Sequence, residues 1–297
     1  MPKALVTGSL GFVGKHLVRY LKNQGYRVTG IDRLMGRESD LSLPDSAGLL
    51  DDLVSGCDEV YHLAGSANIR WCEEHPAEAF QDVVMAINVF DACLKHKKPV
   101  VAASSAQVYG RTYHPMVESA QPAPRSTYAV VKHTIEQMAY LYRGKDLQVS
   151  MARIFNVYGP GQERAVTYKG TVVTDTIKAM LEYPDTPKQV SSWDSVYDFI
   201  YVDDIVAGLH LICAHVPQWG REFCYNLGTG VPVGIFELNE EIAREVGFTG
   251  ELVRMGPGEG PVPMQLVGDN SLLSLLGWKP EVPLREGIRR TVEAFDK

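Results

Sequence analysis

Cysteine is scarce in this chain of 297 residues, and the few cysteines present form no recognisable framework. The five cysteines are scattered, with no Cys-x-x-Cys pair and no histidine spacing typical of zinc, so we expect reduced thiols and no metal site. The sequence also lacks an apolar run of the roughly 20 residues that span a bilayer, and its N-terminus has no signal-peptide pattern. We therefore expect a cytoplasmic protein without a membrane partner.

The chain also has fewer positively charged than negatively charged side chains. Lys and Arg number 29 against 36 Asp and Glu, which gives a net charge of −7 and argues against nucleic acid as a partner. The acidity does not exclude a phosphorylated ligand, because a glycine loop and a helix N-terminus supply local positive potential whatever the total charge.

Segments typical of strands and of helices alternate through the first half of the chain. The predicted strands cover residues 3–7, 26–31, 58–63, 99–103 and 148–154. The predicted helices cover residues 12–24, 76–96 and 126–143, with a further helix at 284–295. This alternation predicts an α/β fold with a doubly wound parallel sheet.

The pattern loosens after about residue 155, where prolines interrupt short elements. We therefore expect a dinucleotide-binding domain over residues 1–165 and mainly a substrate-binding lobe over residues 166–297. Elements near 190–225 are expected to return to the first domain. A cleft between the two parts is the expected place for a substrate.

A glycine-rich turn follows the first predicted strand. Gly8, Gly11 and Gly14 are spaced three apart, and glycine lets the backbone approach a pyrophosphate at the positive N-terminus of the next helix. Asp32 ends the second strand, where a carboxylate accepts hydrogen bonds from the adenosine ribose and repels a 2′-phosphate. The turn and the acid together predict NAD as the cofactor, although the neighbouring Arg33 is of the type that binds a 2′-phosphate.

Tyr128 and Lys132 lie four residues apart and therefore share one face of the predicted helix. A tyrosine titrates near ~10, so action as a base near neutrality requires its pKa to fall by roughly 3 units. A fixed ammonium and an oxidised nicotinamide ring supply charge of the required sign. A Tyr and a Lys at this spacing often occur by chance. In combination with the glycine turn, however, they predict an enzyme that oxidises a hydroxyl group.

These motifs resemble the extended short-chain dehydrogenase/reductase family, in its NAD-dependent epimerase/dehydratase branch. The matching segments are residues 8–14, 32, 62–65, 104–110, 118, 128, 132, 153–160, 198–204, 226–230 and 276–280. The resemblance covers nearly the whole chain. It implies a Rossmann-type sheet with a smaller C-terminal substrate-binding lobe, NAD as cofactor and a sugar or nucleotide-sugar substrate. It also implies a homodimer formed by helices 76–96 and 126–143.

The resemblance assigns roles to individual residues. It makes Tyr128 the base, Lys132 the partner that lowers its pKa and holds the ribose, and Ser105 the group that binds the reacting hydroxyl. The cofactor contacts that it implies are Gly8, Gly11, Phe12, Val13, Gly14, Asp32, Arg33, Asp40, Leu41, Leu63, Ala64, Gly65, Tyr128 and Lys132. The substrate contacts that it implies are Ser105, Ala106, Gln107, Asn156, Tyr197 and Arg254.

The sequence departs from the family pattern at several of these positions. Ala106 and Gln107 stand where the family's dehydratases carry Asp-Glu, and its decarboxylases the same Glu, so neither reaction is expected. Asp82 replaces a usual Asn, while Tyr197 and Gly256 replace arginines that clamp a diphosphate. Candidate substitutes for these arginines are Arg164, Lys169 and Arg254, and candidates for stacking on a base or sugar are Trp193 and Tyr197.

The predicted function is an NAD-dependent sugar epimerase that oxidises a hydroxyl transiently and returns the hydride to the other face of the ketone. Two alternatives stay open. One is an NAD(P)-dependent keto-sugar reductase or dehydrogenase with the same catalytic trio. The other is a dinucleotide-sensing protein without activity, against which the presence of Ser105, Tyr128 and Lys132 counts.

Overall fold

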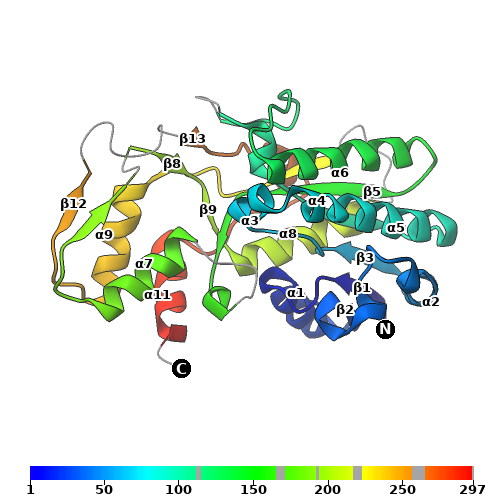
Figure 1. Ribbon diagram of the computed structural model, residues 1–297, viewed down its shortest axis with the longest axis horizontal. Helices are drawn as coiled ribbons and strands as arrows, with labels where there is room; N and C mark the ends of the chain where they lie inside the picture. The colour runs from blue at the N-terminus through cyan, green and yellow to red at the C-terminus, as the bar shows by residue number, and fades with distance from the viewer. Residues whose placement is uncertain (112–114, 165–170, 192–193, 217–222, 256–264, 296–297) are drawn as a thin grey trace.

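A computed structural model describes residues 1–111, 115–164, 171–191, 194–216, 223–255 and 265–295. Its central layer is a six-stranded sheet (Figure 1). In spatial order the strands are β10 (Cys224–Leu227), β5 (Val149–Ile154), β4 (Val100–Ser105), β3 (Glu59–His62), β1 (Lys3–Thr7) and β2 (Arg27–Ile31). All neighbouring strands run parallel, so the predicted doubly wound, Rossmann-type sheet is confirmed.

Helices cover both faces of this sheet. On one face, α2 (Ala47–Ser55), α5 (Gln81–His96) and α6 (Thr127–Arg143) pack side by side, and on the other face lie α1 (Phe12–Asn23) and α8 (Val202–His215). The order of the strands reverses between β1 and β3, and in such sheets ligands bind outside the carboxyl ends of the strands at this point. Within the described residues, no helix is long and apolar enough to cross a membrane.

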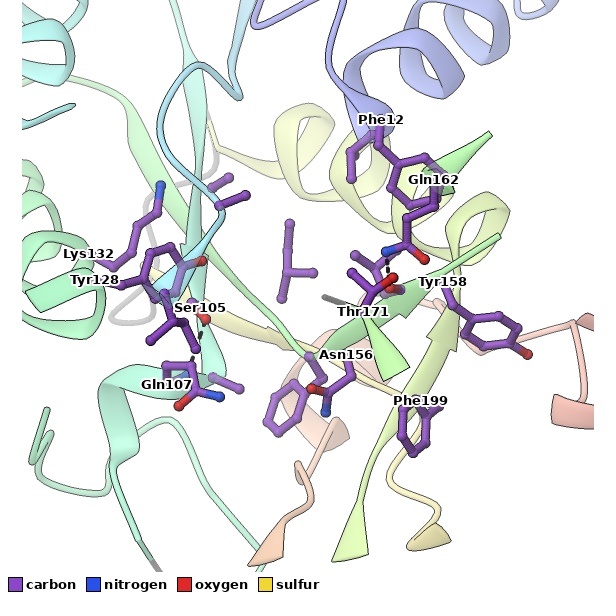
Figure 2. Close-up of a pocket in the computed structure, with 18 of the residues that line it drawn as sticks. Phe12, Ser105, Gln107, Tyr128, Lys132, Asn156, Tyr158, Gln162, Thr171 and Phe199 are labelled. Carbon is purple, nitrogen blue, oxygen red and sulfur yellow. Dashed lines mark hydrogen bonds between the residues drawn. The ribbon is translucent and has the colours of Figure 1, made fainter. Parts of the chain in front are cut away.

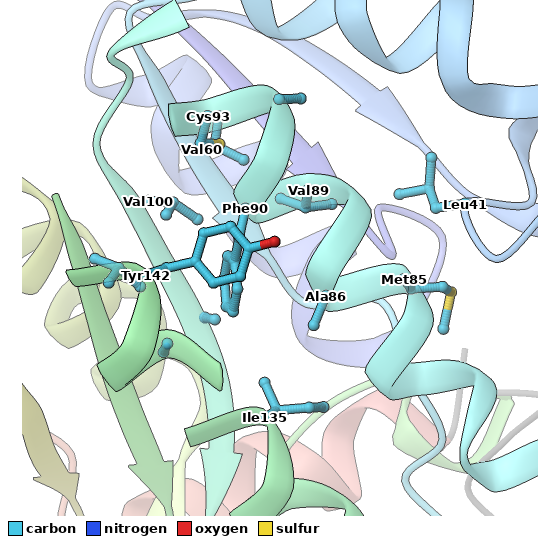
Figure 3. Packing of buried hydrophobic residues seen from close by; sticks show 14 of the residues in the cluster. Leu41, Val60, Met85, Ala86, Val89, Phe90, Cys93, Val100, Ile135 and Tyr142 are labelled. Atoms are coloured by element: carbon cyan, nitrogen blue, oxygen red, sulfur yellow. The ribbon is translucent and has the colours of Figure 1, made fainter. Parts of the chain in front are cut away.

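One apolar core lies beneath α5 and α6, and Figure 3 shows how the two helices meet there. The ring centres of Phe90 and Tyr142 lie 5.7 Å apart. The Tyr142 hydroxyl donates a hydrogen bond to Asp91 at 2.6 Å. Phe90 and Ile135 are almost fully buried, and a side chain of this kind contributes about 1.5–3 kcal/mol on burial. This packing fixes α6, which carries Tyr128 and Lys132, against the body of the domain.

The segment 76–96 differs from the sequence prediction, because it is not a single helix. A short helix α3 (Ile69–Glu74) precedes α4 (Pro76–Ala79), and α5 begins only after Phe80. At this junction the Val83 N–H donates to the Phe80 carbonyl, three residues back, so the chain tightens and the helix axis is interrupted. Short 3₁₀ helices within the described residues are η1 (Arg33–Met35), η2 (Arg37–Ser39), η3 (Pro44–Ser46), η4 (Ala106–Tyr109) and η5 (Gln162–Arg164).

A smaller lobe gathers at the left of Figure 1 around three helices and several very short strands. Its helices are α7 (Val172–Glu182), α9 (Ile235–Val246) and α11 (Leu284–Phe295), and α10 (Ser271–Leu275) lies beside β10. Its strands are β7 (Lys188–Val190), β8 (Val196–Tyr197), β11 (Val233–Gly234), β12 (Leu252–Arg254) and β13 (Gln265–Leu266). A parallel pair, β6 (Asn156–Tyr158) with β9 (Phe199–Tyr201), joins this lobe to the sheet. The predicted division at residue 165 stays a prediction.

Two buried carboxylates hold the loops of this second half. Asp198 accepts hydrogen bonds from the backbone N–H groups of residues 229 and 230, both at 2.8 Å. Asp204 accepts from the N–H groups of residues 281 and 282, at 2.9 and 3.1 Å. Both acids are almost fully buried, and burial raises the pKa of each against the effect of these hydrogen bonds.

A buried ion pair connects α6 to the centre of the sheet. Arg153 of β5 makes two parallel hydrogen bonds to Glu136 of α6, at 2.9 and 2.8 Å, and Ser104 of β4 donates to the same carboxylate at 2.5 Å. Arg153 also donates to the Tyr109 hydroxyl at 2.9 Å, and that hydroxyl donates to Asn226 of β10 at 2.7 Å. Burial alone would raise the Glu136 pKa, but the hydrogen bonds from its partners hold the pKa below its ordinary value.

This ion pair generates a stability prediction. Glu136→Gln leaves the guanidinium of Arg153 buried without its counter-charge, and breaking such a pair costs about 3–5 kcal/mol. We expect a clear fall in the urea midpoint of unfolding, followed by circular dichroism. Glu74→Gln is the matched control, because Glu74 pairs with Arg70 on the exposed surface of α3. Equal midpoints for Glu136→Gln and the wild type would contradict the prediction.

Candidate active site

A cavity of about 240 Å³ lies beside the carboxyl ends of β1, β2 and β3, where the strand order reverses. The predicted cofactor residues that line it are Gly8, Gly11, Asp32, Arg33, Leu41, Leu63, Ala64 and Gly65. Lys15, Asp82 and Met85 line it as well, and the sequence analysis did not assign them to the cofactor. The position agrees with the rule that nucleotides bind at the switch point of a doubly wound sheet.

The glycine turn of this cavity is packed too closely for any side chain. Gly8 has a φ of +68°, and a Cβ there would lie 2.8 Å from the carbonyl oxygen of Leu63. A Cβ on Gly14 would collide with the carbonyl oxygen of Gly8. Gly8 and Gly11 also line the cavity, so the backbone at the N-terminus of α1 is accessible to a ligand, and its N–H groups and dipole favour a negatively charged one. This cradle fits the pyrophosphate of a dinucleotide.

Asp32 holds the glycine turn to the end of β2. One oxygen of its carboxylate accepts from the Leu10 N–H at 3.0 Å, and the other accepts from the Leu34 N–H at 3.1 Å. The acid therefore organises the loops on both sides of the cavity. Each carboxylate oxygen has a further lone pair, so the group can still accept a hydrogen bond from a ribose hydroxyl.

A second cavity of about 500 Å³ continues from the first and shares Gly8, Gly11, Leu63 and Gly65 with it. Figure 2 shows its two sides, with Tyr128, Lys132 and Ser105 facing Phe12 and Thr171 across the space. The other predicted residues that line it are Val13, Gly14, Ala106, Gln107, Asn156 and Tyr197. The structure thus brings residues from both halves of the chain to one cavity.

The predicted catalytic trio comes from two elements of the body. Tyr128 and Lys132 lie on one face of α6, with the Lys132 Nζ 5.9 Å from the centre of the Tyr128 ring. Ser105 ends β4, and its hydroxyl accepts from the Gln107 N–H at 3.2 Å. The lysine is 6% exposed, so its charge lies in a poorly solvated position beside the phenol.

The electrostatics of Tyr128 differ from the simple expectation of a lowered pKa. Burial raises the pKa of Tyr128 to about 12, and the charges of Asp82 and Cys72 act in the same direction. A hydrogen bond to Ser105 acts in the opposite direction and lowers it. The protein groups together therefore favour the protonated phenol, and further positive charge is required before Tyr128 can act as a base near neutrality.

The far side of the larger cavity is formed by the smaller lobe and by the β6–β9 pair. Asn156 donates from its side-chain amide to the Asp198 carbonyl at 3.0 Å, and Tyr197 packs its ring 6.1 Å from that of Phe199. The sequence analysis missed Gln162, Thr171, Val172, Val173, Phe199, Ile235 and Leu266, which also line this side. Apart from Phe199, which lies in the matching segment 198–204, no local motif marks these residues, because they meet only when distant segments fold together.

Two predicted contacts lie apart from the lining of either cavity. Asp40 accepts hydrogen bonds from the Ser42 N–H and hydroxyl, at 3.1 and 2.7 Å, and its neighbour Leu41 lines the cofactor cavity instead. Arg254 is exposed on β12, with its guanidinium 4.3 Å from the centre of the Phe236 ring. Lys169, Trp193, Gly256 and the side chain of Arg164 lie outside the described residues.

The chemistry of the larger cavity is limited by its lining. Within the described part of the chain, no Asp, Glu, His or Arg lines it, and Lys132 supplies the only fixed cation. Nor do the described residues bring three or more His, Cys, Asp or Glu side chains together in a way that could hold a metal ion. The described lining therefore offers hydroxyls, phenols and one ammonium for proton transfer, without a carboxylic acid.

Known proteins show the same architecture. Residues 4–228 match the family model described as the NAD dependent epimerase/dehydratase family. A putative UDP-glucose 4-epimerase of Methanocaldococcus jannaschii is 32% identical over 97% of this chain and 96% of its own. A UDP-glucuronic acid decarboxylase 1 of Arabidopsis thaliana is 31% identical over 99% of this chain and 69% of its own. The crystal structure of UDP-glucose 4-epimerase with UDP-glucose from Thermotoga maritima matches with a TM-score of 0.85 at 26% identity, over 99% and 98% of the two chains.

The glycine cradle generates a binding prediction. In Gly14→Ala the new methyl group meets backbone atoms of Gly8, which cannot move aside as a flexible side chain would. We expect NAD binding, measured by isothermal titration calorimetry, to weaken at least tenfold, which is about 1.4 kcal/mol. Gly48→Ala is the control, because a Cβ at Gly48 in α2 has open space around it. Undiminished affinity in Gly14→Ala would show that the dinucleotide does not use this turn.

Proposed function

Because the chain belongs to the NAD-dependent epimerase/dehydratase family, we propose that it is an NAD-dependent epimerase of a nucleotide sugar. In this reaction one sugar hydroxyl is oxidised to a ketone and then reduced again from the other face. The observation that carries the proposal is the composition of the larger cavity, whose described lining has one phenol–ammonium pair and no carboxylic acid or imidazole. Such a site suits hydride and proton exchange at one carbon.

The same observation favours this reaction over others known on the same fold. Elimination of water needs a further acid and base beside the reacting carbon, and Ala106 and Gln107 cannot exchange protons at these positions. Decarboxylation, the reaction named for the Arabidopsis relative, is disfavoured for the same reason, since Gln107 stands where the resemblance places a Glu. UDP-glucose is the sugar in the names of both the Methanocaldococcus relative and the Thermotoga structure. It is therefore the first substrate to test.

The residues of the smaller cavity have the properties that NAD requires. Gly8 and Gly11 line it and allow the backbone to approach the pyrophosphate, Gly14 allows the turn to pack, and Asp32 accepts hydrogen bonds from the adenosine ribose. Leu41 offers apolar surface in the same cavity. The bound nicotinamide supplies the chemistry of accepting a hydride and returning it.

The chain's own residues then handle the proton and the sugar. Tyr128 takes the proton of the reacting hydroxyl and gives it back at the end, while Ser105 orients that hydroxyl by a hydrogen bond. Lys132 stabilises the negative charge on the phenolate. Asn156 and the aromatic ring of Tyr197 contact the substrate on the opposite side of the cavity, whose other walls are largely apolar. Such walls allow the uncharged ketone to turn and present its other face.

The catalytic prediction uses UDP-glucose with NAD, and products are separated by isomer-resolving chromatography with mass detection. We expect a new peak of unchanged mass, and no accumulation of NADH in step with turnover. Tyr128→Phe removes the proton acceptor and is expected to lower kcat by about a thousandfold with NAD affinity retained.

Tyr140→Phe is the matched control, because Tyr140 is 62% exposed on the same helix. Steady consumption or production of NADH would indicate a net oxidoreductase instead. A protein that binds NAD but converts no member of a panel of nucleotide sugars would be the sensing protein. Near-normal turnover by Tyr128→Phe would contradict the assigned base.

We also propose that the protein is a homodimer formed through α5 and α6. Large apolar side chains are exposed on these two adjacent helices, at Val84, Val130 and Leu141. Val130 and Leu141 are three turns apart and so lie on the same side of α6. An exposed apolar patch of this kind is typical of a protein–protein interface.

The dimer generates a prediction about assembly. Leu141→Glu places a charge in the proposed interface and is expected to give a monomer by size-exclusion chromatography with light scattering. Leu275→Glu is the control, since Leu275 is 82% exposed on α10, away from α5 and α6. A wild-type protein that is already a monomer, or a Leu141→Glu dimer of wild-type affinity, would rule out this interface.

A further inference from the structure

A buried carboxylate lies behind the catalytic pair and takes no part in the mechanism proposed above. Asp82 is in the first turn of α5 and is only 4% exposed. Its Oδ2 accepts a hydrogen bond from the Ser66 N–H at 2.6 Å. Asp82 also lines the cofactor cavity. A buried ionised group is costly unless nearby charges and hydrogen bonds compensate it, so its surroundings carry information about its role.

The cation that compensates the charge of Asp82 is Lys132, and Gly65 lies beside both side chains. A Cβ on Gly65 would lie 2.9 Å from Asp82 Oδ2 and 3.3 Å from Lys132 Nζ. The carboxylate and the ammonium therefore face each other across the same small space, which glycine leaves open. Gly65 lines both cavities, so this pair lies where the two meet. Opposite charges on the two sides of so small a space attract each other more strongly in a poorly solvated site than they would in water.

The charged and titratable groups around Tyr128 come from three elements. Lys132 follows it on α6, Asp82 faces it from α5, and Cys72 faces it from α3. Arg33 of η1 acts on Asp82 from the cofactor side. Burial raises the pKa of Asp82, against the effects of Lys132, Ser66 and Arg33. In the alkaline range where a phenol titrates, this carboxyl is nevertheless ionised.

From this arrangement we propose that Asp82 is a positioning residue that offsets the charge of Lys132 and so keeps the Tyr128 phenol protonated until further positive charge enters the site. With the carboxylate in place, the pair of Asp82 and Lys132 contributes little net charge at the phenol. The oxidised nicotinamide, with its positive ring, then decides whether the base is active. The functional meaning rests on the proposed function, in which Tyr128 is the base.

The sign of the effect of substitution follows from Coulomb's law. Asp82→Asn removes a negative charge near the phenol and leaves the ammonium of Lys132 unopposed. The phenolate is then more stable relative to the phenol, so the pKa of Tyr128 falls. Asparagine has nearly the same shape and retains an oxygen that can accept from the Ser66 N–H, so the fold should persist.

The test is a titration of Tyr128 in the NAD-bound protein. Tyrosine is labelled with carbon-13 at the ring carbon that bears the hydroxyl, and the Tyr128 signal is identified by its loss in Tyr128→Phe. We expect Asp82→Asn to move the titration midpoint down by about one pH unit. Asp51→Asn is the control, because Asp51 pairs with Lys95 and His96 at the far end of α5 and is expected to cause no shift. Circular dichroism checks that each variant is folded.

An unchanged or higher midpoint in folded, NAD-bound Asp82→Asn would overturn the proposal. The titration needs no sugar, so it separates the two proposals. A shifted midpoint in a protein that epimerises no nucleotide sugar would refute the proposed reaction and support the role of Asp82. Epimerase activity together with an unshifted midpoint would support the proposed reaction and refute the role of Asp82.

Discussion

The buried ion pair between Arg153 and Glu136 is the interaction on which the candidate active site depends. Tyr128, Lys132 and Glu136 follow each other at intervals of four residues and therefore lie along one face of α6. Glu136 is bound by Arg153 of β5 and by Ser104 of β4, and Ser104 precedes Ser105 directly. The ion pair thus fixes the position of Tyr128 and Lys132 along the sheet relative to Ser105. The ion pair thereby adds a directional constraint to the apolar packing that already holds α6 against the sheet.

Local signals made much of the body predictable. The glycine turn, the apolar strands and the periodic helices each depend on a short stretch of sequence, and the structure places them within a few residues of their expected bounds. The interruption at Phe80 was missed because apolar periodicity continues through it. The strands of the smaller lobe span only two or three residues and pair across long separations, as β13 does with β8, so no window of sequence reveals them. The rise that burial causes in the pKa of Tyr128 could not be predicted for a related reason, since it depends on tertiary packing.

Relatives of this chain are named for different reactions on one architecture, an epimerase in one case and a decarboxylase in another. The sheet and its glycine turn specify where a dinucleotide binds but not what happens to a sugar. The distinction lies in a few side chains of the larger cavity, above all those that follow Ser105. In the proposed reaction, the described lining has no carboxylic acid, and a bound sugar undergoes only chemistry in which a proton and a hydride leave and return. In this proposal, the type of reaction depends on the acid and base side chains that the cavity lacks as well as on those that it has.

The carboxylates of Asp198 and Asp204 have a consequence for how such a protein can change over evolutionary time. Both acids hold their loops chiefly through backbone N–H groups, at residues 229–230 and 281–282, and the Thr229 hydroxyl adds a side-chain hydrogen bond to Asp198 at 2.6 Å. A substitution at Glu281 or Val282 that keeps the backbone N–H therefore leaves its segment attached to Asp204. At positions of this kind a side chain can change over evolutionary time while the loop stays attached to the body.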